Sequence, residues 1–314
     1  MKIFNWKINL KILGFILLFL PLMPYKSVEA FPIYAQQAYS NPRESNGRIS
    51  CANCHLAQKS VEIELPKAVL PNSIFEAVVK IPYDLNNKQI LGSGTRGGLN
   101  VGAVLILPQG FKLASSNQLT KEFKEKNKGV YISPYSTKAE NILVVGPISG
   151  DKHQEIIFQI VSPDPLLNKE INFLKYPIYV GANRGRGQIN PTGEKTNNNA
   201  ILSQNSGEIL SILINEVGNY DILIRTITGE NITQSIPKSF DLVVSKGMKI
   251  LMDQPLTKDP NIGGFGQTET EIVLQSPERI YGYMLLCFFL LLTQVFLVIK
   301  KKQFEKVQIS EMNF

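Results

Sequence analysis

The stretch Val101-Gly102-Ala103-Val104-Leu105-Ile106-Leu107-Pro108 is a short apolar run that ends at a proline. Similar runs of β-branched and aromatic residues recur along the chain, and Gly, Pro, Asn and Asp separate them. This spacing is typical of an all-β sandwich. The longest helical candidate between these runs is the mostly polar segment 116–128. The other predicted strands are residues 75–83, 141–147, 155–161, 176–181, 208–214, 220–227, 240–245 and 271–275.

Two breaks divide this β-rich region. Residues 190–200 have the composition of a loop, and Pro260, Gly263 and Gly264 mark a second break. The roughly 60 residues between the breaks hold three or four of the predicted strands, which is enough for a small satellite domain. The glycines at 92, 94 and 97 match a dinucleotide-binding pattern, but they precede a strand instead of opening a helix. We interpret them as a turn.

The two ends of the chain predict export and a membrane anchor. Residues 1–30 have a lysine-rich front, an apolar centre and small residues before a cleavage position after Ala30, as in a signal peptide. An uncleaved anchor is the alternative, but two prolines break its short apolar centre. Residues 280–299 carry no charge and are long enough to span a bilayer. Three lysines follow at 300–302, so the tail 300–314 is predicted to stay on the cytoplasmic-type side.

The positive charge of the chain is concentrated at these two ends. The whole chain has a formal net charge of +7, of which residues 1–30 contribute +3 and residues 280–314 contribute +2. The exported part therefore keeps only +2, which does not resemble the basic surface of a nucleic-acid-binding protein. Any acidic protein partner must be attracted by a local cluster of charge.

The sequence Cys51-Ala52-Asn53-Cys54-His55 carries the chemistry. C-x-x-C-H is the attachment motif of a c-type haem, in which two thiols bond the porphyrin and the imidazole binds the iron. A redox dithiol is a weaker alternative, because no βαβ pattern surrounds the motif. Structural zinc would need about four ligands, and the chain has three cysteines and two histidines in all. A disulfide at this spacing would leave His55 unexplained.

The second axial ligand of such a haem iron stays open from composition alone. Methionine or a second histidine usually supplies it. The candidates are His153, Met248 and Met252, and each also has an ordinary interpretation as a surface or packing residue.

Several stretches resemble the cytochrome f family from Phe31 to the last residue. They include the mature start Phe31-Pro-Ile-Tyr-Ala-Gln-Gln37, the motif 51–55, and the segments 99–108 and 176–188. The resemblance implies an elongated, mainly β exported region: an immunoglobulin-like sandwich with a small inserted β domain and one C-terminal transmembrane helix. The implied parts are a cleaved signal peptide 1–30, a large haem domain 31–198 and 262–279, a small domain 199–261, a span 280–299 and a tail 300–314.

The resemblance also implies the site residues. One haem c is attached through Cys51 and Cys54, with His55 and the α-amino group of Phe31 as axial ligands. Relatives usually begin with Tyr, but a backbone nitrogen does not depend on the side chain. A free α-amine has a pKa of about 7.7–8.0, so iron competes only weakly with a proton. The family's buried water chain maps onto Gln89, Asn183, Gln188 and Asn198.

The implied partners are those of the photosynthetic cytochrome bf complex: the Rieske iron-sulfur protein, cytochrome b, and plastocyanin or a soluble c-type cytochrome as acceptor. The implied location is the thylakoid membrane, with the large domain in the lumen and the tail in the stroma, or in the cytoplasm of a cyanobacterium. Lys88 and Arg96, expected on the larger domain, are the docking residues. The segment 213–220 has no lysine where relatives have several, so steering should be weak.

Three functions are therefore weighed: an electron carrier without substrate chemistry of its own, a tethered haem enzyme with an open iron position, and a membrane-anchored thiol oxidoreductase. The reduction potential, the acceptor, the number of copies per complex and the plastid or cyanobacterial source do not follow from the sequence.

Overall fold

The computed structural model describes residues 32–312, so the predicted signal peptide and Phe31 lie outside the described residues. The described chain is mainly β, as predicted, with one long C-terminal helix. It divides into two compact units. Unit 1 comprises Ile90–Gly97 and Asn197–Pro260; the described part of unit 2 comprises residues 32–89, 98–196 and 261–312. The hairpin 90–97 thus belongs to unit 1, which the sequence did not suggest.

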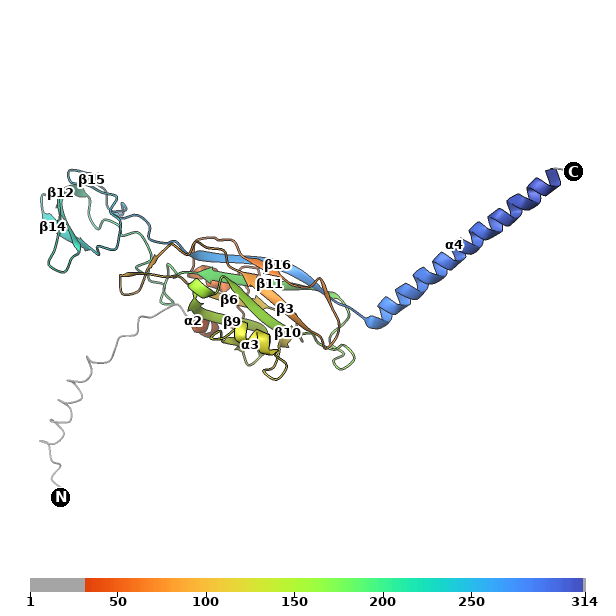
Figure 1. Cartoon of the computed structure of the whole chain (residues 1–314). Helices are drawn as coiled ribbons and strands as arrows, with labels where there is room; N and C mark the ends of the chain where they lie inside the picture. Colours follow the sequence, from red (N-terminus) through yellow and green to blue (C-terminus); the bar gives the residue numbers. More distant parts are fainter. Residues whose placement is uncertain (1–31, 313–314) are drawn as a thin grey trace, which may run out of the picture. The chain divides into compact units, whose positions relative to one another are not determined.

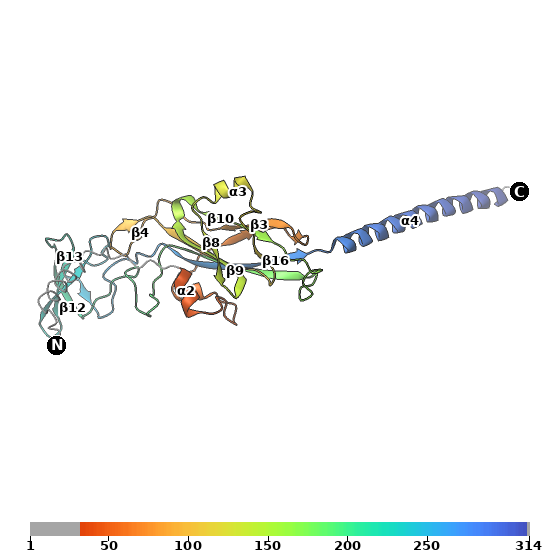
Figure 2. The ribbon, with the colours of Figure 1, turned by 90° about the horizontal axis from the view of Figure 1, so that it is seen from below.

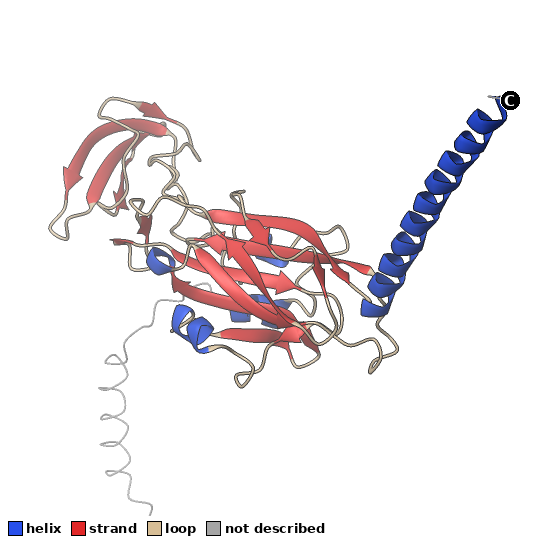
Figure 3. Cartoon of the chain, turned by 45° about the vertical axis from the view of Figure 1, so that its right-hand side comes forward, coloured by secondary structure: helices blue, strands red, loops and turns tan. Residues whose placement is uncertain are grey.

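Unit 2 is built on two antiparallel sheets that pack face to face (Figures 1 and 3). One sheet has four strands in the order β1-β3-β10-β7, and the other has six in the order β2-β16-β11-β6-β9-β8, in which only β2 runs parallel to its neighbour. The strands of the first are β1 (Glu62–Glu64), β3 (Ile74–Lys80), β7 (Lys112–Leu113) and β10 (Glu155–Val161). Those of the second are β2 (Ala68–Val69), β6 (Asn100–Ile106), β8 (Ile132–Ser136), β9 (Ala139–Ser149), β11 (Lys175–Arg184) and β16 (Gly264–Leu274).

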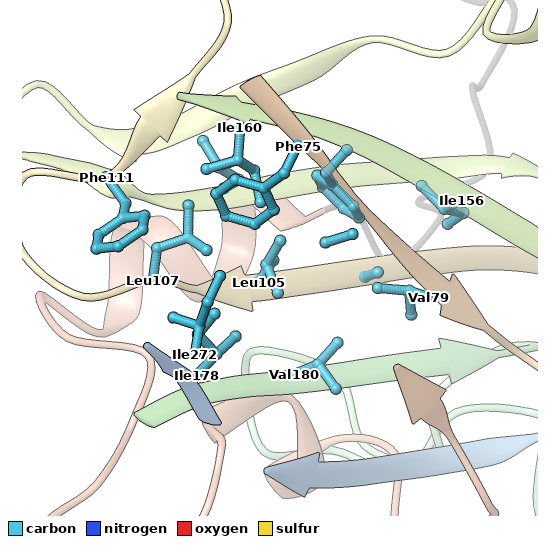
Figure 4. Packing of buried hydrophobic residues seen from close by; sticks show 14 of the residues in the cluster. Phe75, Val79, Leu105, Leu107, Phe111, Ile156, Ile160, Ile178, Val180 and Ile272 are labelled. Atoms are coloured by element: carbon cyan, nitrogen blue, oxygen red, sulfur yellow. The ribbon is translucent and has the colours of Figure 1, made fainter. Parts of the chain in front are cut away.

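The core of unit 2 lies between these sheets. Side chains of Phe75 and Ile160 on the four-stranded sheet meet those of Leu105 and Ile178 on the six-stranded sheet, and all four are buried (Figure 4). Successive residues of a strand point to opposite faces, so β6 sends Val101, Ala103 and Leu105 into this core. Its intervening residues must be covered on the other face.

A second apolar cluster covers the outer face of the six-stranded sheet. It contains Val104 and Ile106 of β6, the alternate residues to those in the core. Because β6 is buried along both faces, this sheet supports structure on its outer side as well. The other members of the cluster, called here the outer cluster, are Ile49, Tyr135, Ile142, Val144 and Phe265, with Cys51, Ala52, Ala139 and Tyr179 packed against them.

Unit 1 has its own sheet and its own core. Its four strands follow the order β14-β13-β12-β15, and a two-stranded hairpin, β4 with β5, begins at the last residue of the preceding unit 2 segment. Buried isoleucines at 209, 222, 224 and 236 fill this core. The strands are β4 (Gln89–Ile90), β5 (Arg96–Gly97), β12 (Gly207–Ile214), β13 (Tyr220–Thr226), β14 (Asn231–Ile236) and β15 (Lys249–Ile250).

Two local predictions were wrong. Residues 240–245 form no strand; Leu242 makes only an isolated bridge with Thr257, while Phe240 and Val244 pack into the core of unit 1. The apolar residues of this run alternate because they are buried, and burial alone does not make a strand. The helix predicted over 116–128 is shorter: α3 (Lys121–Lys126) begins after Thr120, whose hydroxyl accepts a hydrogen bond from the Phe123 amide at 3.2 Å.

The helices outside the sheets are few and short except the last. They are α2 (Pro32–Ala38), the 3₁₀ turns η2 (Ser50–Asn53) and η3 (Gly150–Lys152), α3, and α4 (Pro277–Met312). Helix α4 is the one described helix that is long and apolar enough to cross a membrane (Figure 2). It includes the predicted span 280–299 and continues through the lysines into the described part of the tail.

The two-faced burial of the six-stranded sheet makes its stability testable. Ile178 has no exposed surface, so Ile178→Ala leaves a cavity and should lower the free energy of unfolding by about 2–5 kcal/mol. Leu85→Ala, at a half-exposed loop position of the same unit, should stay within about 0.5 kcal/mol. Hydrogen exchange of the β6 and β11 amides in the solubilised full chain measures both. Equal losses in the two variants would contradict the assigned core.

Candidate functional site

The motif 51–55 forms a single tight turn. Its amides at Cys54 and His55 both donate to the carbonyl oxygen of Cys51, at 3.3 and 3.0 Å. Just before the turn, Ile49 is buried in the outer cluster and its amide donates to the side-chain oxygen of Gln267 on β16 at 2.9 Å. The turn is therefore fastened to the six-stranded sheet, and its two thiols are free.

The imidazole of His55 is buried and neutral. Only 7% of the residue is exposed, and burial lowers the pKa of His55 to about 4. The amide nitrogen of Asn183 lies 3.5 Å from Nε2, whereas Nδ1 has no hydrogen-bond partner among the described residues. A neutral imidazole with a free lone pair is the form that binds a metal. The geometry thus leaves His55 ready to act as a ligand.

The loop that follows β11 is hydrogen-bonded to the backbone at the end of the motif. The Gln188 amide donates to the Cys54 carbonyl at 2.7 Å, and the side-chain oxygen of Gln188 accepts from the Leu56 amide at 2.8 Å. Between β11 and Gln188, Gly187 passes so close that an added Cβ would lie 3.0 Å from the Cys54 carbonyl oxygen. This close approach explains a glycine at position 187.

The two thiols are poorly suited to redox exchange. Burial raises the pKa of the Cys51 thiol to about 11, and burial also raises the pKa of Cys54. Reactive cysteines in thiol oxidoreductases have lowered pKa values, because the thiolate is the nucleophile. The protonated Cys51 thiol here instead packs on an apolar surface, since Cys51 and Ala52 contact the outer cluster.

The arrangement fits a c-type haem better than a metal ion held by the protein alone. Among residues 32–312, no group of three or more His, Cys, Asp or Glu side chains is close enough to bind a metal ion. Haem brings four nitrogen ligands of its own and needs only axial ligands, attachment thiols and an apolar wall. His55, the pair Cys51 and Cys54, and the outer cluster offer those three features.

The N-terminal helix α2 is tied to the same sheet by Tyr135. The buried phenol oxygen of Tyr135 on β8 lies 2.7 Å from the carbonyl oxygens of both Ala35 and Tyr39, and its single proton is donated to one of them at a time. In return, the Gln36 side chain donates to the Tyr135 carbonyl at 2.8 Å. Because Tyr135 belongs to the outer cluster and Cys51 packs against it, helix α2 and the motif share one surface. No motif in the sequence singled out Tyr135.

Three of the four predicted water-chain residues, Gln89, Gln188 and Asn198, are buried, and Asn183 is half-buried. Asn183 and Gln188 contact the motif, as described above. Gln89 lies deeper in unit 2, where its side chain donates to Gly98 O and accepts from the Arg186 amide, both at 2.9 Å. Asn198 is buried but belongs to unit 1.

The two predicted docking residues lie in different units. Lys88 is exposed on unit 2. Arg96, expected on the larger domain, belongs instead to unit 1, where its guanidinium pairs with Asp241 at 3.0 Å and donates to the Ser239 carbonyl at 3.1 Å. Its charge is therefore partly compensated.

The three other candidates for the second axial ligand are divided between the two units. His153 follows η3 in a turn of unit 2, and Met248 and Met252 are exposed residues of unit 1.

Comparison with known proteins gives a consistent result over the whole described chain. The family model described as "Apocytochrome F, N-terminal" matches residues 31–185, and "Apocytochrome F, C-terminal" matches residues 197–314. A protein of Gracilaria tenuistipitata var. liui named cytochrome f is 59% identical over 99% of this chain and all of its own length. The protein of that name from Porphyra purpurea is 63% identical over 92% of this chain and 90% of its own.

The Tyr135 hydroxyl should control the order of α2. Tyr135→Phe removes only the hydrogen bond of the phenol, which contributes about 0.5–1.5 kcal/mol. Amide exchange at Tyr39, whose amide bonds to Ala35, should become up to about tenfold faster, since 1.4 kcal/mol corresponds to a factor of ten. Tyr131→Phe is the matched control, because Tyr131 is 80% exposed. Unchanged exchange in Tyr135→Phe would contradict this anchoring role.

Proposed function

Because the chain belongs to the cytochrome f family, we propose that it carries electrons from a Rieske iron-sulfur protein to plastocyanin or a soluble c-type cytochrome. Members of this family are c-type cytochromes of the photosynthetic cytochrome bf complex in the thylakoid membrane. They are electron-transfer subunits, and helix α4 fits a membrane anchor. The observation that carries the proposal is the buried, neutral His55 beside two free thiols on an apolar wall.

One haem c, attached through both Cys51 and Cys54, supplies a one-electron iron couple when bound. The chain's own contribution is to fix one axial ligand and to exclude water. His55 is held by its turn and by the hydrogen bonds of Gln188, so its ring has little freedom to move. Apolar side chains of the outer cluster lower the local dielectric, and such burial is one of the factors that tune a haem potential.

The second axial ligand that we propose is the α-amino group of Phe31. Helix α2 begins at the next residue, Pro32, and Tyr135 fastens this helix beside the motif. Proline at the first helical position fixes the backbone dihedral φ and thereby limits the directions in which the terminal amine points. This amine exists only after cleavage at Ala30, so ligation and processing are coupled.

The proposed topology places units 1 and 2 in the lumen and the tail in the stroma, or in the cytoplasm if the source is cyanobacterial.

Docking of an acidic acceptor would use Lys88, which is exposed, more than Arg96, whose guanidinium is engaged by Asp241. Because Asp241 pairs with one of these two docking cations, association should be less sensitive to salt than in plant relatives. Gln89, Asn183, Gln188 and Asn198 are proposed to line a buried water chain near the haem.

Covalent attachment has a direct test with an internal control. After denaturing electrophoresis the wild-type chain should keep haem stain, because thioether bonds survive denaturation. The double variant Cys51→Ser/Cys54→Ser should lose the stain, whereas Cys287→Ser, in the exposed part of α4, should keep it. Stain retained by the double variant would exclude thioether attachment at the motif. This outcome would leave the family membership intact but remove the proposed site.

Axial ligation by the N-terminus predicts a dependence on processing. The wild-type chain should give a sharp low-spin reduced-minus-oxidised spectrum that carbon monoxide does not change, with Phe31 as its first residue. Ala30→Leu, which blocks cleavage by placing a large residue at the processing position, should give a spectrum that shifts with carbon monoxide. An uncleaved variant with the native spectrum would show that another group supplies the second ligand.

A further inference from the structure

Four leucines are exposed at one end of unit 2. Leu166, Leu167 and Leu174 belong to the segment 163–174 between β10 and β11, and their exposed fractions are 78%, 82% and 54%. Leu70, directly after β2, is 46% exposed. Single exposed leucines are ordinary, but a gathering of them on one end of a unit marks an interaction surface. These four residues are called here the leucine face.

The segment 163–174, which carries three of the four leucines, is held in place by hydrogen bonds. Asp164 organises it: the carboxylate accepts from the Leu166 amide and from the Asn72 side chain, both at 2.9 Å. The backbone carbonyl of Asp164 accepts from the Leu167 amide at 3.1 Å. In the same segment Ile171 is buried in the core. The leucines therefore stay exposed although the segment folds back into the core beside them.

The leucine face lies where the chain leaves unit 2 for the membrane. At this end of β16 the Leu274 amide donates to the Leu174 carbonyl at 3.0 Å, and the Gln275 amide donates to the Val69 carbonyl at 2.9 Å. The predicted span begins at position 280. Six residues reach at most about 20 Å, so Leu274 and its neighbours stay within that distance of the bilayer core. Figures 1 and 2 show the green segment beside this end of β16.

Charge at this end does not favour an electrostatic contact. The basic residues here are Lys67, Lys112, Lys169, Lys175 and Arg279, and the acidic residues are Asp164, Glu170, Glu271 and Glu278. The two sets nearly balance, and Lys175 already pairs with Glu271. A basic patch would have indicated anionic lipid headgroups. With nearly balanced charge, the attraction that remains is burial of apolar surface.

We propose that the leucine face inserts into the interfacial region of the bilayer that α4 crosses, so that unit 2 rests on the lipid surface. Apolar side chains on peripheral segments bury about 5–10 Å into the boundary between headgroups and acyl chains. Two points of contact, the span and the leucine face, restrict the tilt of unit 2 against the membrane. This contact does not depend on the haem or on the identity of the electron acceptor.

The test uses tryptophan fluorescence, for which this chain is well suited. Its one tryptophan, Trp6, lies in the predicted signal peptide, so the mature chain has none. Leu167→Trp in the full mature chain, placed in nanodiscs of phosphatidylcholine, provides a single reporter on the leucine face. Val217→Trp, at an 84% exposed position of unit 1, is the matched control. Quenching is taken as the emission ratio between plain and brominated lipid, in which energy transfer to the haem cancels.

We expect Leu167→Trp to emit at shorter wavelength than Val217→Trp and to lose about half of its emission or more in brominated lipid, as for residues at the acyl boundary. The control should be unaffected. Emission like that of the control would show a solvated face and overturn the proposal. A short-wavelength emission that brominated lipid does not quench would show a protein partner instead of lipid. Quenching that requires anionic lipid would also contradict contact by apolar burial.

Discussion

The constraint on which unit 2 depends is that its six-stranded sheet is buried on both faces. Along β6, Val101, Ala103 and Leu105 fill the space between the sheets, while Val104 and Ile106 form part of the outer cluster. A sheet with one solvated face would give the motif 51–55 nothing apolar to rest on. Because the outer face is apolar, the turn at Cys51 packs there, and Tyr135 draws α2 to the same surface.

Burial on that face also determines the chemistry of the motif. The same loss of solvent acts in opposite directions on the two kinds of group, because it disfavours whichever form is charged. It keeps the Cys51 and Cys54 thiols protonated and the His55 imidazole neutral. A thiol oxidoreductase would instead require cysteines whose pKa is lowered, so that the thiolate forms. One physical cause thus disfavours exchange chemistry and at the same time prepares His55 as a ligand.

The sequence predicted the parts of this structure whose signals are local. The strand 155–161 agrees with β10, and the attachment motif needs only its spacing and its histidine. What depends on distant residues was not predictable. Nothing near Tyr135 indicates that its hydroxyl meets Ala35, about a hundred positions earlier, and nothing near Arg96 indicates that it pairs with Asp241 in unit 1. The strand predicted over 240–245 was wrong for the same reason: a strand needs a neighbouring strand to pair with as well as a suitable run of residues.

At the polar end of β11, two neighbouring side chains point to opposite faces of the sheet. Asn183 faces the motif, and the next residue, Arg184, points to the opposite side, where only 1% of it is exposed. Burial lowers the pKa of Arg184 to about 10, so the guanidinium is still charged at neutral pH. It donates to the Ser60 carbonyl, but its Nε and Nη1 atoms have no partner among the described residues. Buried donors of this kind are commonly satisfied by ordered water. This unmet demand lies on the face of β11 opposite to Asn183, so polar groups at this end of the strand are buried on both sides of the sheet.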